Sequence, residues 1–216
     1  MNEVIEFIKQ NKEFYPEYFI NNRLEKCNYG YTCDVDQIYC YLNKVNIKTT
    51  IYNTFYNITK KYFDLKNKRI LEVGCGKIPI LSGLFKDNNI NIDAIDSNIL
   101  INNYKDITTI KYDLQKEYDI SKYDLIIGLR PCNITENIID RCFKYKKDFI
   151  IYLCPCIHKS KNNNIFNTYE EWISYLKDKI SNNKEYSFEF IYSNNLPDNC
   201  PIIIGKYNGN IFNKVI

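Results

Sequence analysis

Three polar features follow successive apolar runs of this sequence, and together they could bind a nucleoside. The first run, residues 70–73, leads into Gly74-Cys75-Gly76, where glycines permit a tight turn and close approach of a ligand to the backbone. The second run ends in Asp96, whose carboxylate can accept hydrogen bonds from both hydroxyls of a ribose. The third run is followed by Asp113, which can accept a hydrogen bond from an adenine amino group. The spacing therefore predicts a site for a nucleoside-containing cofactor.

A nicotinamide dinucleotide is a less suitable ligand for this glycine loop. Its fingerprint needs a third glycine three residues after the second, at the position that Pro79 occupies. Pro79 instead suits the first turn of a helix, where its missing N–H leaves no hydrogen bond unmade. A plain tight turn without any ligand is the other interpretation. It is disfavoured because Asp96 and Asp113 also stand at the expected strand ends.

Short β-branched runs alternate with helical stretches from residue 69 onward, and these elements must position the loop and the acids. The pattern predicts a helix up to about residue 86, one from about residue 135, and strands at 69–73, 90–95, 108–112, 124–129 and 149–153. Buried strands separated by helices indicate a parallel sheet covered on both faces. A helix at 169–180 then precedes two closely joined strands, 187–193 and 201–207, which should pair antiparallel.

The first 65 or so residues have a different, helical pattern. Helices are expected around residues 2–11, 34–42 and 48–63, with apolar side chains at helical spacing at Ile51, Phe55, Ile58 and Tyr62. We therefore expect a helical cap of residues 1–65 and a second domain of residues 66–216.

The composition excludes several classes of protein. A chain of 216 residues with 45% hydrophobic and 25% charged residues is typical of a soluble globular protein rather than a disordered or fibrous one. The longest apolar stretch is far shorter than the roughly 20 residues of a membrane-spanning helix. The amino terminus has an acidic residue where a secretory signal would be positive, so we expect a cytoplasmic protein. A net charge of +3 is too small to indicate a dedicated nucleic-acid binder.

The nine cysteines are the unusual feature of the composition, and we expect them to be reduced thiols. Four lie at or near strand ends, where the ligand crevice of a parallel sheet is found, and the only histidine follows them: Cys75, Cys132, Cys154, Cys156 and His158. The group has three interpretations. The thiols are buried small hydrophobes, or Cys132, Cys154, Cys156 and His158 bind a metal, or a thiolate is a nucleophile. The Cys-x-Cys-x-His spacing is not the usual Cys-x-x-Cys spacing of metal sites.

The segment from about residue 68 to residue 207 resembles the class I S-adenosylmethionine-dependent methyltransferases. The resemblance rests on ILEVGCG, the acid in AIDSN, the acid in KYDL, the strand KYDLIIGL and the closing hairpin. It implies an α/β fold with a Rossmann-like, seven-stranded, mostly parallel sheet and one antiparallel strand, and it implies S-adenosylmethionine as the cofactor. Ile78 departs from the pattern, because many members have a third glycine at this position.

The resemblance also implies roles for individual residues. In that family the acid of the first motif lies near the methionine end of the cofactor, the glycines lie under the sugar, and the next acid binds the ribose. These roles carry over to Glu72, to Gly74 and Gly76, and to Asp96. The other expected members of the cofactor site are Cys75, Ser97, Asp113, Leu114 and Arg130.

The segment after the fourth strand resembles two further families. A Pro-Cys at Cys132 and another cysteine after the fifth strand, Cys156, resemble the RNA cytosine methyltransferases, in which a thiolate attacks the pyrimidine ring. Those enzymes carry an Asp where this chain has Arg130, and no RNA-binding domain is evident. The Arg-Pro pair also resembles an uncharacterised family of small Rossmann-like proteins, which implies no activity. Arg130 itself could hold a carboxylate or phosphate, or pair with a surface acid.

These patterns lead to one expected function and its alternatives. The chain is expected to transfer a methyl group from S-adenosylmethionine to a small-molecule acceptor, mainly by positioning the two reactants. Cys132, Cys156 and His158 are candidate catalytic residues, and His158 could act as a general base or be structural. Residues 27–41 are a candidate lid, although aromatic residues at helical spacing are also typical of a core. The alternatives are an RNA base methyltransferase and an inactive or metal-binding Rossmann-like module.

Overall fold

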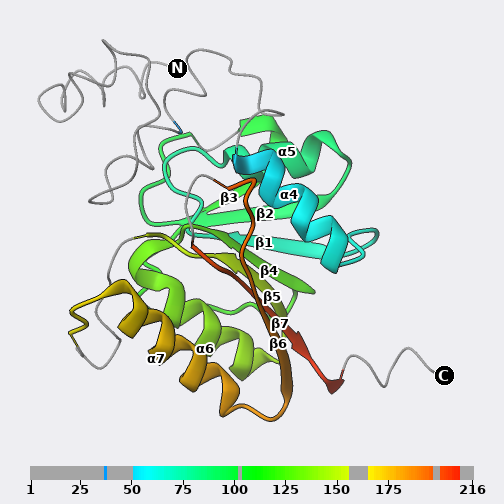
Figure 1. The fold of residues 1–216 in the computed structure, drawn as a ribbon. Helices are drawn as coiled ribbons and strands as arrows, with labels where there is room; N and C mark the ends of the chain where they lie inside the picture. The colour runs from blue at the N-terminus through cyan, green and yellow to red at the C-terminus, as the bar shows by residue number, and fades with distance from the viewer. Residues whose placement is uncertain (1–36, 38–50, 102–103, 156–164, 197–199, 210–216) are drawn as a thin grey trace, which may run out of the picture.

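The computed structural model describes residues 37, 51–101, 104–155, 165–196 and 200–209 of the chain. Within these ranges the strands are β1 (Arg69–Val73), β2 (Asn91–Asp96), β3 (Thr108–Lys111), β4 (Leu125–Leu129), β5 (Asp148–Tyr152), β6 (Tyr186–Ile191) and β7 (Ile202–Tyr207). They form one seven-stranded sheet in the order β3-β2-β1-β4-β5-β7-β6 (Figure 1). Strands β1 to β5 pair in parallel, and β7 runs antiparallel to both β5 and β6. The α/β class and the mostly parallel sheet with one reversed strand are thus confirmed.

The central strands are continuous apolar runs because both faces of the sheet are covered. All five residues of β5 are buried, and so are the first four of β4. Successive side chains of a strand point to opposite faces, so neighbouring residues enter different cores. In β1, Ile70 packs in one hydrophobic cluster and Leu71 in the other.

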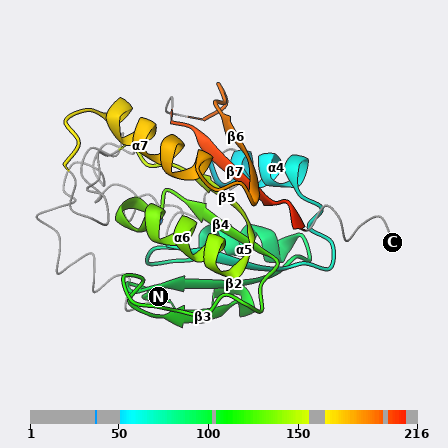
Figure 2. The ribbon, with the colours of Figure 1, turned by 90° about the horizontal axis from the view of Figure 1, so that it is seen from below.

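Two pairs of helices cover the two faces of the sheet (Figure 2). Helices α4 (Ile51–Tyr62) and α5 (Ile80–Asp87) contribute to the cluster that contains Ile70. Helices α6 (Thr135–Tyr145) and α7 (Tyr169–Ser181) contribute to the cluster that contains Leu71. Two short 3-10 helices, η3 (Tyr104–Asp106) and η4 (Cys132–Ile134), lie in the connections that follow β2 and β4. The strands and helices expected from residue 69 onward are all present, with boundaries within a few residues of the predicted ones.

Helix α4 packs on α5 through one face. Its buried residues, Tyr52, Phe55, Tyr56 and Thr59, recur at the spacing of an amphipathic helix. The ring of Tyr56 meets that of Phe85 edge-on, with 4.9 Å between the ring centroids. The helix predicted at 48–63 is therefore present over Ile51–Tyr62. Phe55 is fully buried as expected, whereas Ile51, Ile58 and Tyr62 are partly buried against the same cluster. The division into residues 1–65 and 66–216 stays a prediction, and the helices expected around 2–11 and 34–42 lie outside the described residues, except for Gln37, which is helical.

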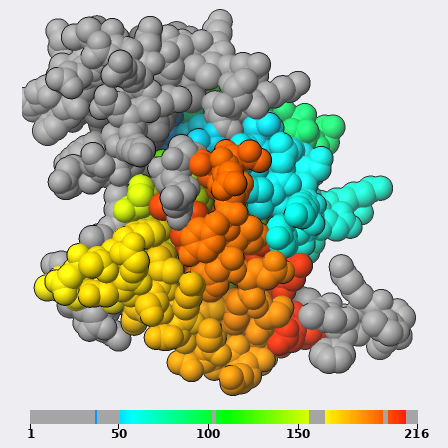
Figure 3. Space-filling view, viewed as in Figure 1, coloured from blue at the N-terminus to red at the C-terminus, as the bar shows by residue number. Residues whose placement is uncertain are grey.

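Strand β6 is the edge strand on the β5 side of the sheet. In the space-filling view it lies at the surface together with α7 and α4 (Figure 3). Only Tyr186, its first residue, is fully buried.

Across the described ranges, none of the helices has the length and apolar character needed to cross a membrane.

Candidate functional site

The glycine loop leaves β1 at the centre of the sheet and turns directly into the approach to α5. Gly74 and Gly76 have φ angles of +76° and +73°, which side chains other than glycine rarely adopt. The N–H of Gly74 donates to the carbonyl of Ile95 at 2.9 Å, which fixes the loop beside the end of β2. Pro79 lies immediately before the first residue of α5, one position earlier than the first helical turn predicted for it. Both glycines are thus required by the backbone, and the tight turn is confirmed.

Asp96, the last residue of β2, binds this loop through its carboxylate. Oδ2 accepts from the N–H of Gly76 at 2.9 Å, and Oδ1 accepts from the N–H of Asn98 at 2.8 Å. An ionised carboxylate has about four lone-pair sites, so each oxygen can accept a further hydrogen bond. The Asp96 side chain therefore holds the loop and still has acceptor capacity for two hydroxyl groups.

Glu72 lies behind the loop on β1, and it is almost completely buried. Its Oε2 accepts from the N–H of Ser82 at 3.0 Å and from the Ser82 hydroxyl. Ser82 is in the first turn of α5, where backbone N–H groups lack partners within the helix and favour negative charge. Burial raises the pKa of Glu72 to about 7; the bonds from Ser82 lower it, and the charge of Asp96 raises it slightly. Glu72 can therefore gain or lose a proton near neutral pH.

Cys75, between the two glycines, is buried in a small apolar cluster with Ala94, Ile99 and Ile107. Burial, followed by the negative charges of Glu72 and Asp96, raises the pKa of its thiol well above the usual value. A thiol that stays protonated is a poor nucleophile, so this side chain acts as a small hydrophobic residue.

Gln37, in the amino-terminal part of the chain, also binds the glycine loop through its side chain. Its Nε2 donates to the carbonyl of Cys75 at 2.6 Å, and its Oε1 accepts from the N–H of Lys77 at 2.9 Å and of Ile78 at 3.3 Å. It falls within the segment 27–41 that was considered as a lid. Nothing in the local sequence pattern singles it out, because its partners are 38 to 41 residues away.

The connection between β4 and α6 also packs against the glycine loop. A Cβ at Gly74 would lie 3.0 Å from the Cβ of Pro131, so the two connections are in van der Waals contact. Arg130 and Cys132 on either side of this proline have φ angles of +53° and +50°. A left-handed conformation costs an L-residue roughly 1–2 kcal/mol, and two such residues together often mark a functional segment.

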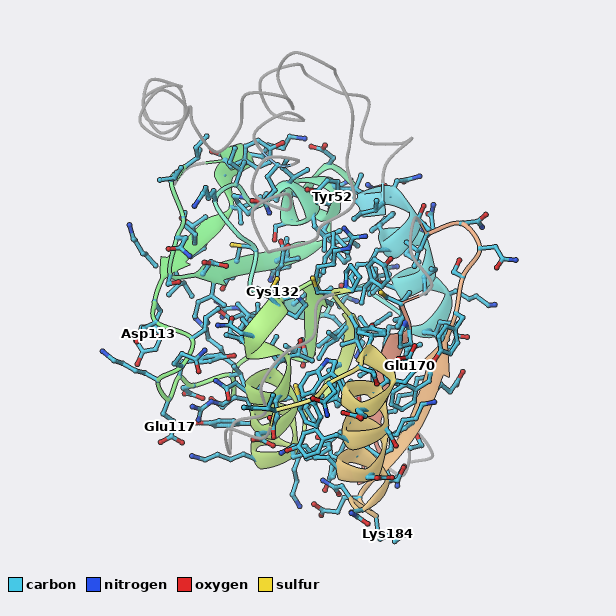
Figure 4. The ribbon with its side chains drawn as sticks, turned by 60° about the vertical axis from the view of Figure 1, so that its left-hand side comes forward. Tyr52, Asp113, Glu117, Cys132, Glu170 and Lys184 are labelled. Carbon is cyan, nitrogen blue, oxygen red and sulfur yellow. The ribbon has the colours of Figure 1, made fainter. Side chains whose placement is uncertain are left out.

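Arg130 and Cys132 differ in their exposure. The guanidinium of Arg130 lies over the ring of Tyr152, 5.3 Å from its centroid, and the Arg130 N–H donates to the Tyr152 carbonyl at 2.8 Å. The residue is buried, so its guanidinium does not lie on the surface. Cys132 is partly exposed and begins η4, beyond the carboxyl end of β4 (Figure 4).

The remaining expected cofactor residues lie around the ends of β2 and β3. Ser97 follows Asp96 and is exposed. Asp113 is exposed and well separated from Cys132 (Figure 4), with its Oδ1 accepting from the N–H of Gln115 at 3.0 Å. Leu114 is buried in the core beneath α6. The structure thus brings Glu72, the glycines, Cys75 and Asp96 together and places Asp113 at the periphery.

The proposed thiol cluster is only partly described. Cys154 is buried close to Tyr169 and Cys200, and burial followed by these thiols raises the pKa of the Tyr169 hydroxyl far above its usual value. Cys156 and His158 lie outside the described residues. Among the residues that are described, no three Asp, Glu, Cys or His side chains are grouped so as to hold a metal ion. The metal and nucleophile interpretations stay hypotheses.

Two residues of the site were not predicted from the sequence: Ser82, which binds Glu72, and Gln37, which binds the glycine loop. A signal existed for Ser82, because a serine in the first turn of a helix after a buried acid can donate to that acid. No comparable signal existed for Gln37.

The fold has counterparts among solved structures. The plantazolicin methyltransferase BpumL, solved in complex with SAH, superimposes with a TM-score of 0.53 at 16% sequence identity, over 90% of this chain and 98% of the other. Magnesium protoporphyrin IX methyltransferase from Synechocystis PCC 6803, solved with bound SAM, superimposes with a TM-score of 0.51 at 12% identity, over 94% of each chain. No protein-family profile matches the sequence, and no curated protein matches it. The sheet order, the reversed β7 and these superpositions show that the chain has the Rossmann-like fold of the class I methyltransferases.

Proposed function

We propose that this chain is an S-adenosylmethionine-dependent methyltransferase that acts on a small-molecule acceptor. The observation that carries the proposal is the pairing of the glycine loop with Asp96. The two left-handed glycines turn the loop tightly between Pro131 and Gln37, and the adjoining carboxylate keeps two acceptor positions for ribose hydroxyls. The residues present therefore fit a nucleoside-containing cofactor.

Each residue of the site has a specific part in this proposal. Gly74 and Gly76 lie under the sugar, Asp96 binds its hydroxyls, and Glu72 lies at the methionine end, where an ionised carboxylate favours a cationic group. Ser97, Asp113, Leu114 and Arg130 are proposed as the remaining wall of the cofactor site. S-adenosylmethionine supplies an activated methyl group on a sulfonium, so the protein has mainly to position the acceptor and exclude water.

A small-molecule acceptor is favoured over a nucleic acid by the charge of the chain. The net charge of +3 is spread over 29 basic and 26 acidic residues, whereas nucleic-acid binding requires a clustered excess of Lys and Arg. One of the structural neighbours is named for magnesium protoporphyrin IX, which is a small molecule.

Transfer of labelled methyl groups tests the proposal. Full-length protein is incubated with methyl-tritiated S-adenosylmethionine and either a small-molecule extract or total RNA, and label is counted in each fraction. Wild type should label the small-molecule fraction. Asp96→Ala should do so at least tenfold more slowly, because hydrogen bonds to a charged acceptor contribute about 1.5–3 kcal/mol each. Binding of the cofactor without transfer to either fraction would instead identify an inactive binding module.

A thiol-dependent RNA base methyltransferase is the second candidate. It is favoured by the position of Cys132, partly exposed after a proline at the carboxyl end of β4. Label in RNA that is lost in Cys132→Ala, with Cys142→Ala as a control for a buried thiol in α6, would support this candidate and contradict the small-molecule acceptor.

A further inference from the structure

The side-chain amide of Gln37 binds the glycine loop at three points, one before Gly76 and two after it. It donates to the carbonyl of Cys75 at 2.6 Å and accepts from the N–H groups of Lys77, at 2.9 Å, and Ile78, at 3.3 Å. The contacts therefore bracket Gly76 on both sides. Asp96 holds Gly76 itself through its N–H. Four consecutive loop residues are fixed by two side chains, one from β2 and one from the amino-terminal part of the chain.

A primary amide is suited to this set of contacts. The loop offers one acceptor and two donors, so the side chain that binds it must both donate and accept. A carboxylate could accept from Lys77 and Ile78 but could not donate to Cys75, and an ammonium could only donate.

The amide lies on the side of Gly76 that a side chain would occupy. A Cβ built on Gly76 would come within 2.6 Å of Gln37 Nε2, which is closer than real Cβ atoms approach other heavy atoms. The φ of +73° already favours glycine at position 76, and a side chain there would also have to displace the Gln37 amide from the loop.

We propose that Gln37 is a positioning residue for the cofactor: it holds residues 75–78 in the conformation in which the glycine loop and Asp96 bind S-adenosylmethionine. The inference rests on the proposed function. A loop that is already held in its binding conformation loses less conformational freedom when the ligand binds. The hydrogen bonds of Gln37 should therefore increase the affinity for the cofactor. Deleting them should weaken binding even though Gln37 is not assigned a contact with the cofactor.

Titration of full-length protein with S-adenosylhomocysteine tests this role in Gln37→Met and Gln37→Ala. Methionine keeps the length and volume of glutamine but forms none of the three hydrogen bonds. Both variants should bind about tenfold more weakly, which corresponds to about 1.4 kcal/mol of binding free energy. Asn88→Ala is the matched control. It removes an amide that donates to the Leu84 carbonyl at 2.8 Å at the other end of α5, and it should bind like wild type.

Amide hydrogen exchange supplies a readout specific to the loop. In Gln37→Met the N–H groups of Lys77 and Ile78 should exchange faster, whereas the N–H of Gly76 should remain protected by Asp96. Binding by Gln37→Met within twofold of wild type, or tighter binding, would overturn the positioning role while leaving the cofactor assignment intact. Absence of binding by well-folded wild type would overturn the proposed function and this role with it.

Discussion

Gly74→Ala should lower the free energy of unfolding by about 3 kcal/mol and remove measurable binding of S-adenosylhomocysteine. The φ of +76° costs an alanine roughly 1–2 kcal/mol. Its Cβ would also lie 3.0 Å from both the Cβ of Pro131 and the Cδ1 of Ile134, and overpacking of this kind costs about 1–3 kcal/mol. Relief of the clash must separate the glycine loop from the connection after β4. Urea denaturation measures the first effect, and calorimetric titration measures the second.

Gly128→Ala is the matched control for this prediction. Its Cβ would approach the same proline, 3.2 Å from Pro131 Cγ, but no left-handed φ is required at this position. The control should therefore be less destabilising than Gly74→Ala by roughly the 1–2 kcal/mol of the left-handed conformation. Equal losses of stability in the two variants, or normal ligand binding by Gly74→Ala, would show that the loop tolerates the change and that its geometry is not needed for binding.

Glu72→Gln should raise the free energy of unfolding more at pH 8 than at pH 4.5. The difference between the two effects should be up to about 3 kcal/mol. Burial raises the pKa of Glu72 from 4.5 to about 7, so the folded chain binds this proton more tightly than the unfolded chain does. Wild type therefore loses stability as the pH rises from about 4.5 to 7, and the full cost is present above pH 7. One pKa unit corresponds to about 1.36 kcal/mol. Glutamine stays neutral, and its carbonyl oxygen can still accept from Ser82.

Denaturation of wild type and Glu72→Gln across pH 4.5 to 8.5 measures this difference. Ser82→Ala provides a second test, because the hydrogen bond from the Ser82 hydroxyl lowers the pKa of Glu72. In this variant the loss of stability that accompanies ionisation of Glu72 should occur at higher pH than in wild type. A stability difference between Glu72→Gln and wild type that is constant with pH would contradict the assignment. The gain in stability should be accompanied by weaker cofactor binding, because the ionised carboxylate is the form that favours a cation.

The sheet could be predicted from the sequence because its strands are short apolar runs with sharp polar ends. The β1 run stops before Gly74, and β2 ends at Asp96, so both the strand and the candidate site residue at its end are evident in the local sequence. The antiparallel pairing of β6 and β7 was also predictable, since a short connection between two strands favours it.

Contacts between distant segments could not be predicted in this way. Gln37 meets the loop across about forty residues, and neither its type nor its spacing distinguishes it from the other polar residues of the amino-terminal region. The ionisation of Glu72 depends on complete burial, which a five-residue strand pattern does not reveal. The left-handed backbone at Arg130 and Cys132, on either side of the proline that packs against Gly74, likewise had no signal in residue type, because neither is a residue that favours this conformation.

Calorimetric titration of a single variant tests whether the glycine loop and Asp96 bind a nucleoside-containing cofactor, as we propose. Full-length wild type and Asp96→Asn are titrated calorimetrically with S-adenosylhomocysteine at pH 8. We predict one molecule bound per wild-type chain and binding at least tenfold weaker in Asp96→Asn, because the amide keeps the shape of the side chain but loses the charged acceptor. No binding by folded wild type, or equal binding by both proteins, would contradict the claim.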